Sequence, residues 1–84
     1  MKTLHIMRKI NDPFALAAIT DESGKWPTAL LLIQDGVLTT EILPEETYVC
    51  HEDLSARGAE SPYLSINYTG MARLITECGR VITW

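Results

Sequence analysis

Residues 28–37 read TALLLIQDGV, and this stretch decides how the rest of the chain must fold. Ala29–Ile33 is an unbroken apolar run, whereas a strand with one face in water alternates apolar and polar residues. A run of this length that ends in Gln34-Asp35-Gly36 is typical of a central parallel strand covered by helices on both faces. Gln34–Gly36 would then lie at the carboxyl end of that strand, where open α/β sheets bind their ligands.

Composition sets the size and class of the molecule. The 84 residues suffice for a single domain, 1–84, in which 46% of residues are hydrophobic and 21% are charged. A domain of this size buries only about 60–65% of the surface that its unfolded chain exposes, so the composition is unusually apolar. We therefore expect another subunit to cover part of the surface, because a small α/β sheet has few helices to shield it.

The charge and the cysteines exclude several classes of protein. The formal net charge is -4 and no basic stripe is present, which argues against direct binding of nucleic acid. Two cysteines make no disulfide framework, and no apolar run is long enough to cross a bilayer. With no signal peptide apparent, the expected location is a reducing cytoplasm, without membrane association.

Strands and short helices alternate along the chain. Besides the central run, the predicted strands are Thr3–Met7, Thr47–Cys50, Tyr63–Tyr68 and Arg80–Trp84. This alternation indicates parallel strands joined by right-handed crossovers. The predicted fold class is a small three-layer α/β/α domain with a mostly parallel sheet of four or five strands.

Three helices and a short helical crossover are predicted between the strands. Asp12 caps the first helix and Pro13 occupies its first position, where a missing N–H costs nothing. The inner face of this helix is expected to comprise Phe14, Leu16, Ala17, Ala18 and Ile19. The crossover, one or two turns, falls within Val37–Leu43, and a short helix over His51–Arg57 closes at Gly58. The last helix begins at Thr69, and its apolar stripe comprises Met71, Leu74, Ile75 and Cys78.

Cys50 is the strongest candidate for chemistry. It ends a strand and starts a short helix, where free amides and the helix dipole lower the pKa of a thiol. His51 follows directly and is a candidate to support the thiolate. Glu52 and Asp53 act against a thiolate, because nearby negative charge disfavours it. The alternative interpretation is a partly buried cysteine that packs as a small hydrophobic side chain.

The remaining cysteine, aspartate and histidine candidates are expected to have structural roles. Cys78 lies on the apolar stripe of the last helix, so core packing is expected. Cys50, His51 and Cys78 lack the paired spacing of zinc sites, and we expect neither a metal nor a cofactor. Asp35 is typical of a turn rather than a general base. His5 lies inside a strand and is expected to be a hydrogen-bonded structural residue.

Large aromatic residues with polar atoms are numerous for so small a core. Such rings are enriched at protein interfaces, so together they favour an oligomer or a hetero-complex. The set comprises Trp26, Tyr48, Tyr63, Tyr68 and Trp84.

Five features keep a distinctive order along nearly the whole chain. They are LHIMRK near the start, LLLIQDGV in the centre, VCHEDLSARG after the third strand, INYTGMARL, and Trp84. Together they resemble the TusB/DsrH family of sulfur-relay subunits. The most specific pieces are Gln34–Val37 and Glu52–Leu54 leading to Ala56–Gly58. None of these pieces is a catalytic fingerprint, so their order and spacing carry the resemblance.

The resemblance implies a DsrE/DsrF/DsrH-type subunit of a cytoplasmic TusBCD/DsrEFH-like complex. Its expected partners are TusC/DsrF-like and TusD/DsrE-like subunits in a hetero-hexamer, with a homo-oligomer expected when the chain is isolated. Such a complex passes persulfide sulfur from TusA-like donors toward TusE/DsrC-like acceptors. In TusB lineages the sulfur ends in 2-thiouridine at the tRNA wobble position, and in DsrH lineages it serves dissimilatory sulfur oxidation.

The resemblance also bears on Cys50. In the TusD/DsrE-like subunit the sulfur-carrying cysteine begins the helix that ends in Arg-Gly, and Cys50 takes that position ahead of Arg57-Gly58. Many TusB-like chains have an apolar residue there. Two hypotheses follow: a non-catalytic subunit that completes the complex, or a persulfide carrier that acts through Cys50. The alternative without sulfur chemistry is a stand-alone homo-oligomeric domain that binds a small ligand, at the Gln34–Gly36 edge, or another protein.

Overall fold

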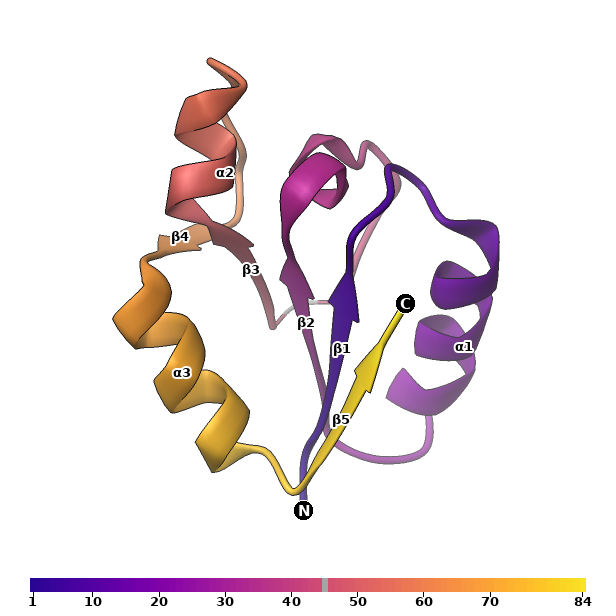
Figure 1. The fold of residues 1–84 in the computed structure, drawn as a ribbon. Coiled ribbons are helices and arrows are strands. Elements are labelled where there is room, and N and C mark those ends of the chain that lie inside the picture. Colours follow the sequence, from indigo (N-terminus) through magenta and orange to yellow (C-terminus); the bar gives the residue numbers. More distant parts are fainter. Residues whose placement is uncertain (45) are drawn as a thin grey trace.

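The apolar run forms β2 (Thr28–Leu32), the middle strand of a five-stranded sheet. In the computed structural model, which describes residues 1–44 and 46–84, the strand order is β4-β3-β2-β1-β5 (Figure 1). Every neighbouring pair is parallel. Because β2 has neighbours on both edges and side chains buried on both faces, it is apolar throughout.

The other strands are β1 (Thr3–Met7), β3 (Thr47–Cys50), β4 (Leu64–Ile66) and β5 (Arg80–Thr83). The helices are α1 (Pro13–Ser23), the 3-10 helix η1 (Gln34–Leu38), α2 (His51–Ala56) and α3 (Tyr68–Glu77). The predicted fourth strand was too long, because Asn67 already caps α3 by accepting from the Gly70 N–H. The crossover helix begins three residues before the predicted segment, with only Ile33 between it and β2.

The strand order determines which face each helix covers. The chain steps from β1 through β2 and β3 to β4, and α3 then returns across the sheet to β5 (Figure 1). Since parallel crossovers are right-handed, α1 and α3 must cover opposite faces. The core confirms this: Ala15 and Ile19 of α1 belong to one apolar cluster, and Leu74 of α3 belongs to the other. The three-layer α/β/α prediction is therefore confirmed.

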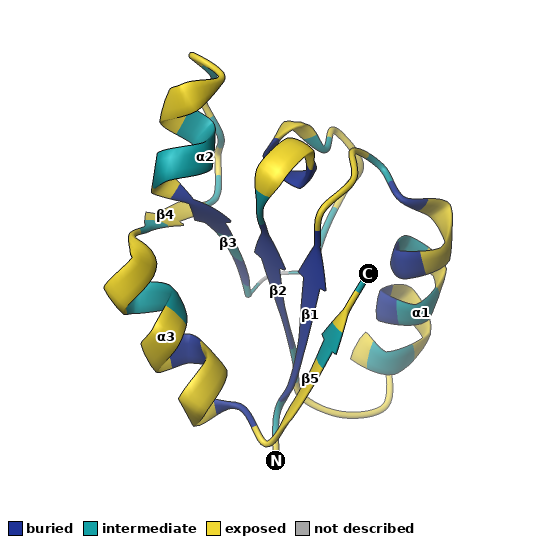
Figure 2. Cartoon of the chain, viewed as in Figure 1, coloured by how far each residue is buried: buried dark blue, intermediate teal, exposed yellow. Residues whose placement is uncertain are grey.

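Alternate residues of the two central strands fill these two cores. Met7 and Leu30 pack beneath α1, whereas Leu4 and Leu31 pack beneath α3. Figure 2 shows β1 as a buried strand throughout, with β2 buried along nearly its whole length. The edge strands β4 and β5 are more exposed.

The predicted inner face of α1 is partly wrong. The Asp12 side chain caps the helix as expected, accepting from the backbone N–H groups of Phe14 and Ala15. Phe14, however, is 79% exposed and Ala17 is also exposed, whereas Ala15 and Ile19 are buried. The helix has apolar residues on every side, so periodicity alone did not identify the side that meets the sheet.

The apolar stripe of α3 contains fewer buried residues than predicted. Leu74 and Cys78 are buried, and Met71 packs against the same cluster. Ile75, by contrast, is 40% exposed. A single helix that lies on a sheet uses a narrow line of contacts, and Ile75 falls at the edge of that line.

The buried His5 side chain of β1 links this strand to α1 and to the residue that follows β5. Its side chain is completely buried. Its Nδ1 accepts from the Trp84 Nε1–H at 3.0 Å, so the ring proton lies on Nε2, which donates to Glu22 Oε2 at 2.5 Å. These bonds link β1 to the residue after β5 and to α1. The predicted structural role of His5 is confirmed.

Candidate functional site

Cys50 lies at the carboxyl end of β3 and is the N-cap of α2, which confirms its predicted place in the fold. Its side chain is 0% exposed. The thiol donates to Glu52 Oε1, with Sγ and Oε1 3.7 Å apart. Burial raises the pKa of the Cys50 thiol, and the Asp53 carboxylate adds to the increase against the opposing effect of backbone N–H groups. A buried, protonated thiol is a weak nucleophile.

His51 has different surroundings from its neighbour. Its side chain is exposed, and its Nδ1 lies 3.3 Å from the Ser65 hydroxyl oxygen of β4. The structure thus gives the His51 ring a hydroxyl partner on the surface, while the Cys50 thiol is enclosed.

A polar network joins η1 to α2 beside Cys50. The backbone N–H of Gln34 donates to Asp53 Oδ2 at 2.7 Å. Arg57 donates to Asp35 Oδ1 at 3.1 Å through Nε and to the Asp53 carbonyl oxygen at 3.0 Å through Nη1. We call these four residues, Gln34, Asp35, Asp53 and Arg57, the η1–α2 clamp.

The backbone of η1 explains why a glycine follows Gln34-Asp35. Gln34 has a φ of 52°, a left-handed conformation that is uncommon for a residue other than glycine. A Cβ at Gly36 would overlap the Met7 carbonyl oxygen. Only glycine lets η1 lie this close to the end of β1, where the Gly36 N–H donates to the Arg8 carbonyl oxygen at 3.2 Å. The polar carboxyl end of β2 therefore has a packing role.

Sequence reasoning did not identify the η1–α2 clamp. From the sequence, Gln34–Gly36 is predicted to lie at the ligand-binding edge of the sheet and Asp53 to oppose a thiolate at Cys50, and neither prediction pairs the two segments. The spacing of a carboxylate and an arginine on the short helix, Asp53 and Arg57, was the available signal, because residues four apart lie on one helical face.

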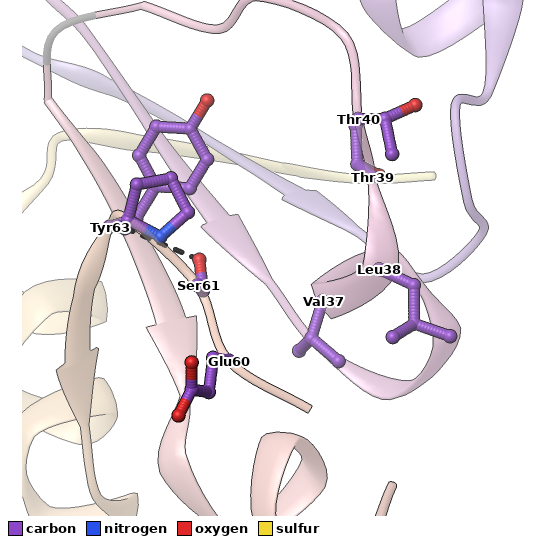
Figure 3. Close-up of a pocket in the computed structure, with 8 residues that line it drawn as sticks. Val37, Leu38, Thr39, Thr40, Glu60, Ser61 and Tyr63 are labelled. Carbon is purple, nitrogen blue, oxygen red and sulfur yellow. Dashed lines mark hydrogen bonds between the residues drawn. The ribbon is translucent and has the colours of Figure 1, made fainter. Parts of the chain in front are cut away.

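A groove of about 330 Å³ lies between η1 with the loop that follows it and the segment before β4 (Figure 3). One wall is the segment Val37–Thr40 and the other is Glu60–Tyr63, the segment that leads into β4. Glu60 is the only ionisable carboxylate in the lining, and among the described residues no buried side-chain polar atom lacks a hydrogen-bond partner. The groove thus shows no built set of ligand-binding groups.

No protein-family model matches the chain, and no curated protein matches it. The resemblance to TusB/DsrH subunits therefore rests on the sequence segments alone.

The other two residues considered from the sequence, Cys78 and Asp35, have structural roles. Cys78 is buried, and burial raises the pKa of its thiol. The Asp35 carboxylate is 69% exposed and pairs with Arg57. Residues 1–44 and 46–84 contain no cluster of three or more metal-ligating side chains. Within the same ranges, no helix is long and apolar enough to cross a membrane.

The polar contacts described above join the helices η1 and α2, which follow the carboxyl ends of β2 and β3. The nucleophile candidate is enclosed, the neighbouring histidine binds a hydroxyl, and the charged residues bind each other. These contacts can fix the relative position of η1 and α2.

Proposed function

We propose that this protein is a non-catalytic subunit of a cytoplasmic sulfur-relay complex of the TusBCD/DsrEFH type. One observation carries the proposal. The two most specific pieces of the resemblance, Gln34–Val37 and Glu52–Gly58, lie far apart in the sequence yet form the η1–α2 clamp. The clamp borders Cys50, whose counterpart in the resembled TusD/DsrE-like subunit carries sulfur. The parallel α/β fold supports the same proposal.

The surroundings of Cys50 support a role without sulfur transfer by this chain. A carrier must expose a thiolate to a donor persulfide, and attack on the terminal sulfur then moves that sulfur to the carrier as the donor thiolate leaves. Cys50 is 0% exposed and its thiol donates to a carboxylate. Both features oppose this step, so we assign the transfer itself to a TusD/DsrE-like partner.

The exposed apolar side chains support assembly with other subunits. Phe14, Ile42 and Leu64 are 79%, 98% and 64% exposed. In a subunit of a larger complex, such side chains are the candidates for contact with partners. In the proposed complex, TusC/DsrF-like and TusD/DsrE-like subunits cover part of this surface, and sulfur passes from a TusA-like donor to a TusE/DsrC-like acceptor.

Co-expression tests the assembly. The chain is produced with TusC/DsrF-like and TusD/DsrE-like subunits, and the mass of the purified complex is measured. We expect all three subunits to purify together in equal amounts. A chain that stays apart from both partners while remaining folded would favour the alternative, a stand-alone homo-oligomeric binding domain.

Persulfide loading tests the absence of a carrier role. The assembled complex is incubated with a persulfide donor, and each subunit is examined by mass spectrometry. We expect a one-sulfur adduct on the TusD/DsrE-like subunit and an unmodified Cys50. An adduct on this chain that is lost in Cys50→Ser and kept in Cys78→Ser would show that Cys50 is a carrier after all.

A further inference from the structure

The buried His5 ring has a hydrogen-bond partner on each of its two nitrogens. Its side chain is 0% exposed, Nδ1 accepts from the Trp84 Nε1–H at 3.0 Å, and Nε2 donates to Glu22 Oε2 at 2.5 Å. A neutral imidazole has one donor and one acceptor, so it satisfies both partners. An imidazolium has two donors and no acceptor. The contact with Trp84 therefore requires the neutral ring.

A second proton would enter the His5 ring at Nδ1, the nitrogen that faces the indole of Trp84. Two N–H groups would then point at each other across the 3.0 Å that now holds a hydrogen bond. The bond to Glu22 would be kept and would become an ion pair, because Nε2 retains its proton. Protonation of the ring therefore breaks one of its two contacts and strengthens the other.

The elements packed around His5 present both signs of charge to the ring. α1 contributes the Glu22 carboxylate, whose second oxygen, Oε1, lies 3.5 Å from Arg80 Nη1 of β5. On the other side, β2 pairs the apolar Leu30 with His5. Glu22 is therefore the counter-charge that an imidazolium would meet in the interior, and Arg80 competes for the same carboxylate.

The backbone of Trp84 is held by contacts that do not involve the imidazole. Its N–H donates to the Ile6 carbonyl oxygen at 2.9 Å, and its carbonyl oxygen accepts from Arg8 Nε at 2.7 Å. The strand before it, β5, pairs with β1 in parallel (Figure 1). The Trp84 side chain, by contrast, packs against the apolar cluster beneath α1. Loss of the bond to His5 can therefore free the indole without detaching the strand.

We propose that His5 is a proton-operated latch on the Trp84 side chain. The neutral ring holds the indole against the apolar cluster beneath α1. When the ring takes a second proton, the indole turns away and uncovers part of that cluster, while β5 stays in the sheet. Histidine is the side chain that ordinarily titrates between about pH 5 and pH 8, so the latch responds to mild acid. This inference goes beyond the proposed function, because it needs neither partner subunits nor sulfur.

The indole N–H resonances of the ¹⁵N-labelled chain test the latch directly. The chain contains two tryptophans, and Trp26, which is 44% exposed in the loop before β2, is the internal reference. As the pH falls from about 8 to about 5, we expect the Trp84 indole proton to shift upfield. Relative to Trp26, its exchange with water should become about fivefold faster or more, the effect of losing one hydrogen bond.

Three variants assign the titrating group. The chain contains two histidines, so His51→Gln is the matched control, and it should keep the response of Trp84 because the His51 side chain is exposed and bonds to Ser65. His5→Gln should abolish the response. Glu22→Gln keeps the imidazole but removes its counter-charge, so the response should move to lower pH.

Three results would overturn the proposal. A Trp84 signal that stays constant over the whole pH interval means that no latch operates. A response that disappears in His51→Gln belongs to the surface histidine. A response that coincides with loss of helical circular dichroism reports acid unfolding of the whole chain instead of local release. Each result leaves the proposed function intact, because co-expression and persulfide loading test that function separately.

Discussion

At the scale of single residues, Gly36 leaves no room for a side chain. A Cβ there would overlap the Met7 carbonyl oxygen, which belongs to a central strand and has little freedom to move. We expect Gly36→Ala to lower the free energy of unfolding by about 1–3 kcal/mol, measured by urea denaturation. Gly24→Ala is the control, because its new Cβ would meet nothing nearer than 3.8 Å. Equal losses in the two variants would contradict the assigned close approach.

The indole N–H of Trp84 satisfies one nitrogen of a completely buried histidine. Trp84→Phe keeps an aromatic ring but removes the donor, so His5 Nδ1 loses its 3.0 Å partner. Leaving a buried polar group unpaired costs about 1–3 kcal/mol, and we expect a loss of that size in thermal or urea unfolding. Trp26→Phe provides the comparison, since Trp26 is 44% exposed, and it should change stability much less.

Single residues also show where sequence reasoning succeeds. The Asp12 cap was predictable because a cap depends on its own and the next few residues. The exposure of Phe14 was not, because α1 offers apolar residues to either side. The position of Cys50 at a helix start was local information, whereas its burial depends on the packing of a sheet and a helix around it.

At the scale of elements, the η1–α2 clamp makes its two carboxylates unequal. Asp53 accepts from the Gln34 backbone N–H, whereas the Asp35 carboxylate is 69% exposed and, within residues 1–44 and 46–84, pairs with Arg57 alone. We expect Asp53→Ala to cost about 1 kcal/mol and to speed hydrogen exchange at the Gln34 amide. Asp35→Ala should cost less than about 0.5 kcal/mol, the usual worth of an exposed pair. If the two variants lost the same free energy of unfolding, the Asp53 carboxylate would have no special role as the acceptor of the Gln34 N–H.

The elements themselves were more predictable than the contacts between them. The bounds of β1 and β3 were predictable because each segment is rich in apolar and β-branched residues and is followed by a polar or helix-starting residue. The predicted strand from Tyr63 was too long, because Asn67 caps the next helix and ends the extended segment. The clamp joins residues 34 and 53, and no local pattern specifies a pair so far apart in the sequence.

At the scale of the whole molecule, alternating strands and helices predicted parallel pairing but did not give the order of strands. β1 pairs with β5, so Leu4 lies beside Val81. That pairing sends α3 back across the sheet to the opposite face from α1. Each face carries one long helix, α1 or α3, so the two outer strands stay more exposed than the central ones and the outside of α1 exposes residues such as Phe14.

Two buried thiols should make the stability of the whole fold depend on alkaline pH. Burial raises the pKa values of Cys50 and Cys78 in the folded chain. The unfolded chain then releases these protons first, so the stabilisation is complete below about pH 8.5, where an unfolded cysteine titrates, and decreases as the pH rises toward the folded pKa values.

We therefore expect the free energy of unfolding, measured by urea denaturation, to fall between about pH 8 and pH 10. The double variant Cys50→Ala, Cys78→Ala should be less stable at neutral pH because each substitution leaves a small cavity. Its stability should nevertheless change much less with pH up to about pH 9, before Tyr48, whose pKa is also raised by burial, begins to contribute. If both proteins lose stability equally as the pH rises, other groups cause the loss, and the enclosed state of the two thiols does not contribute to it.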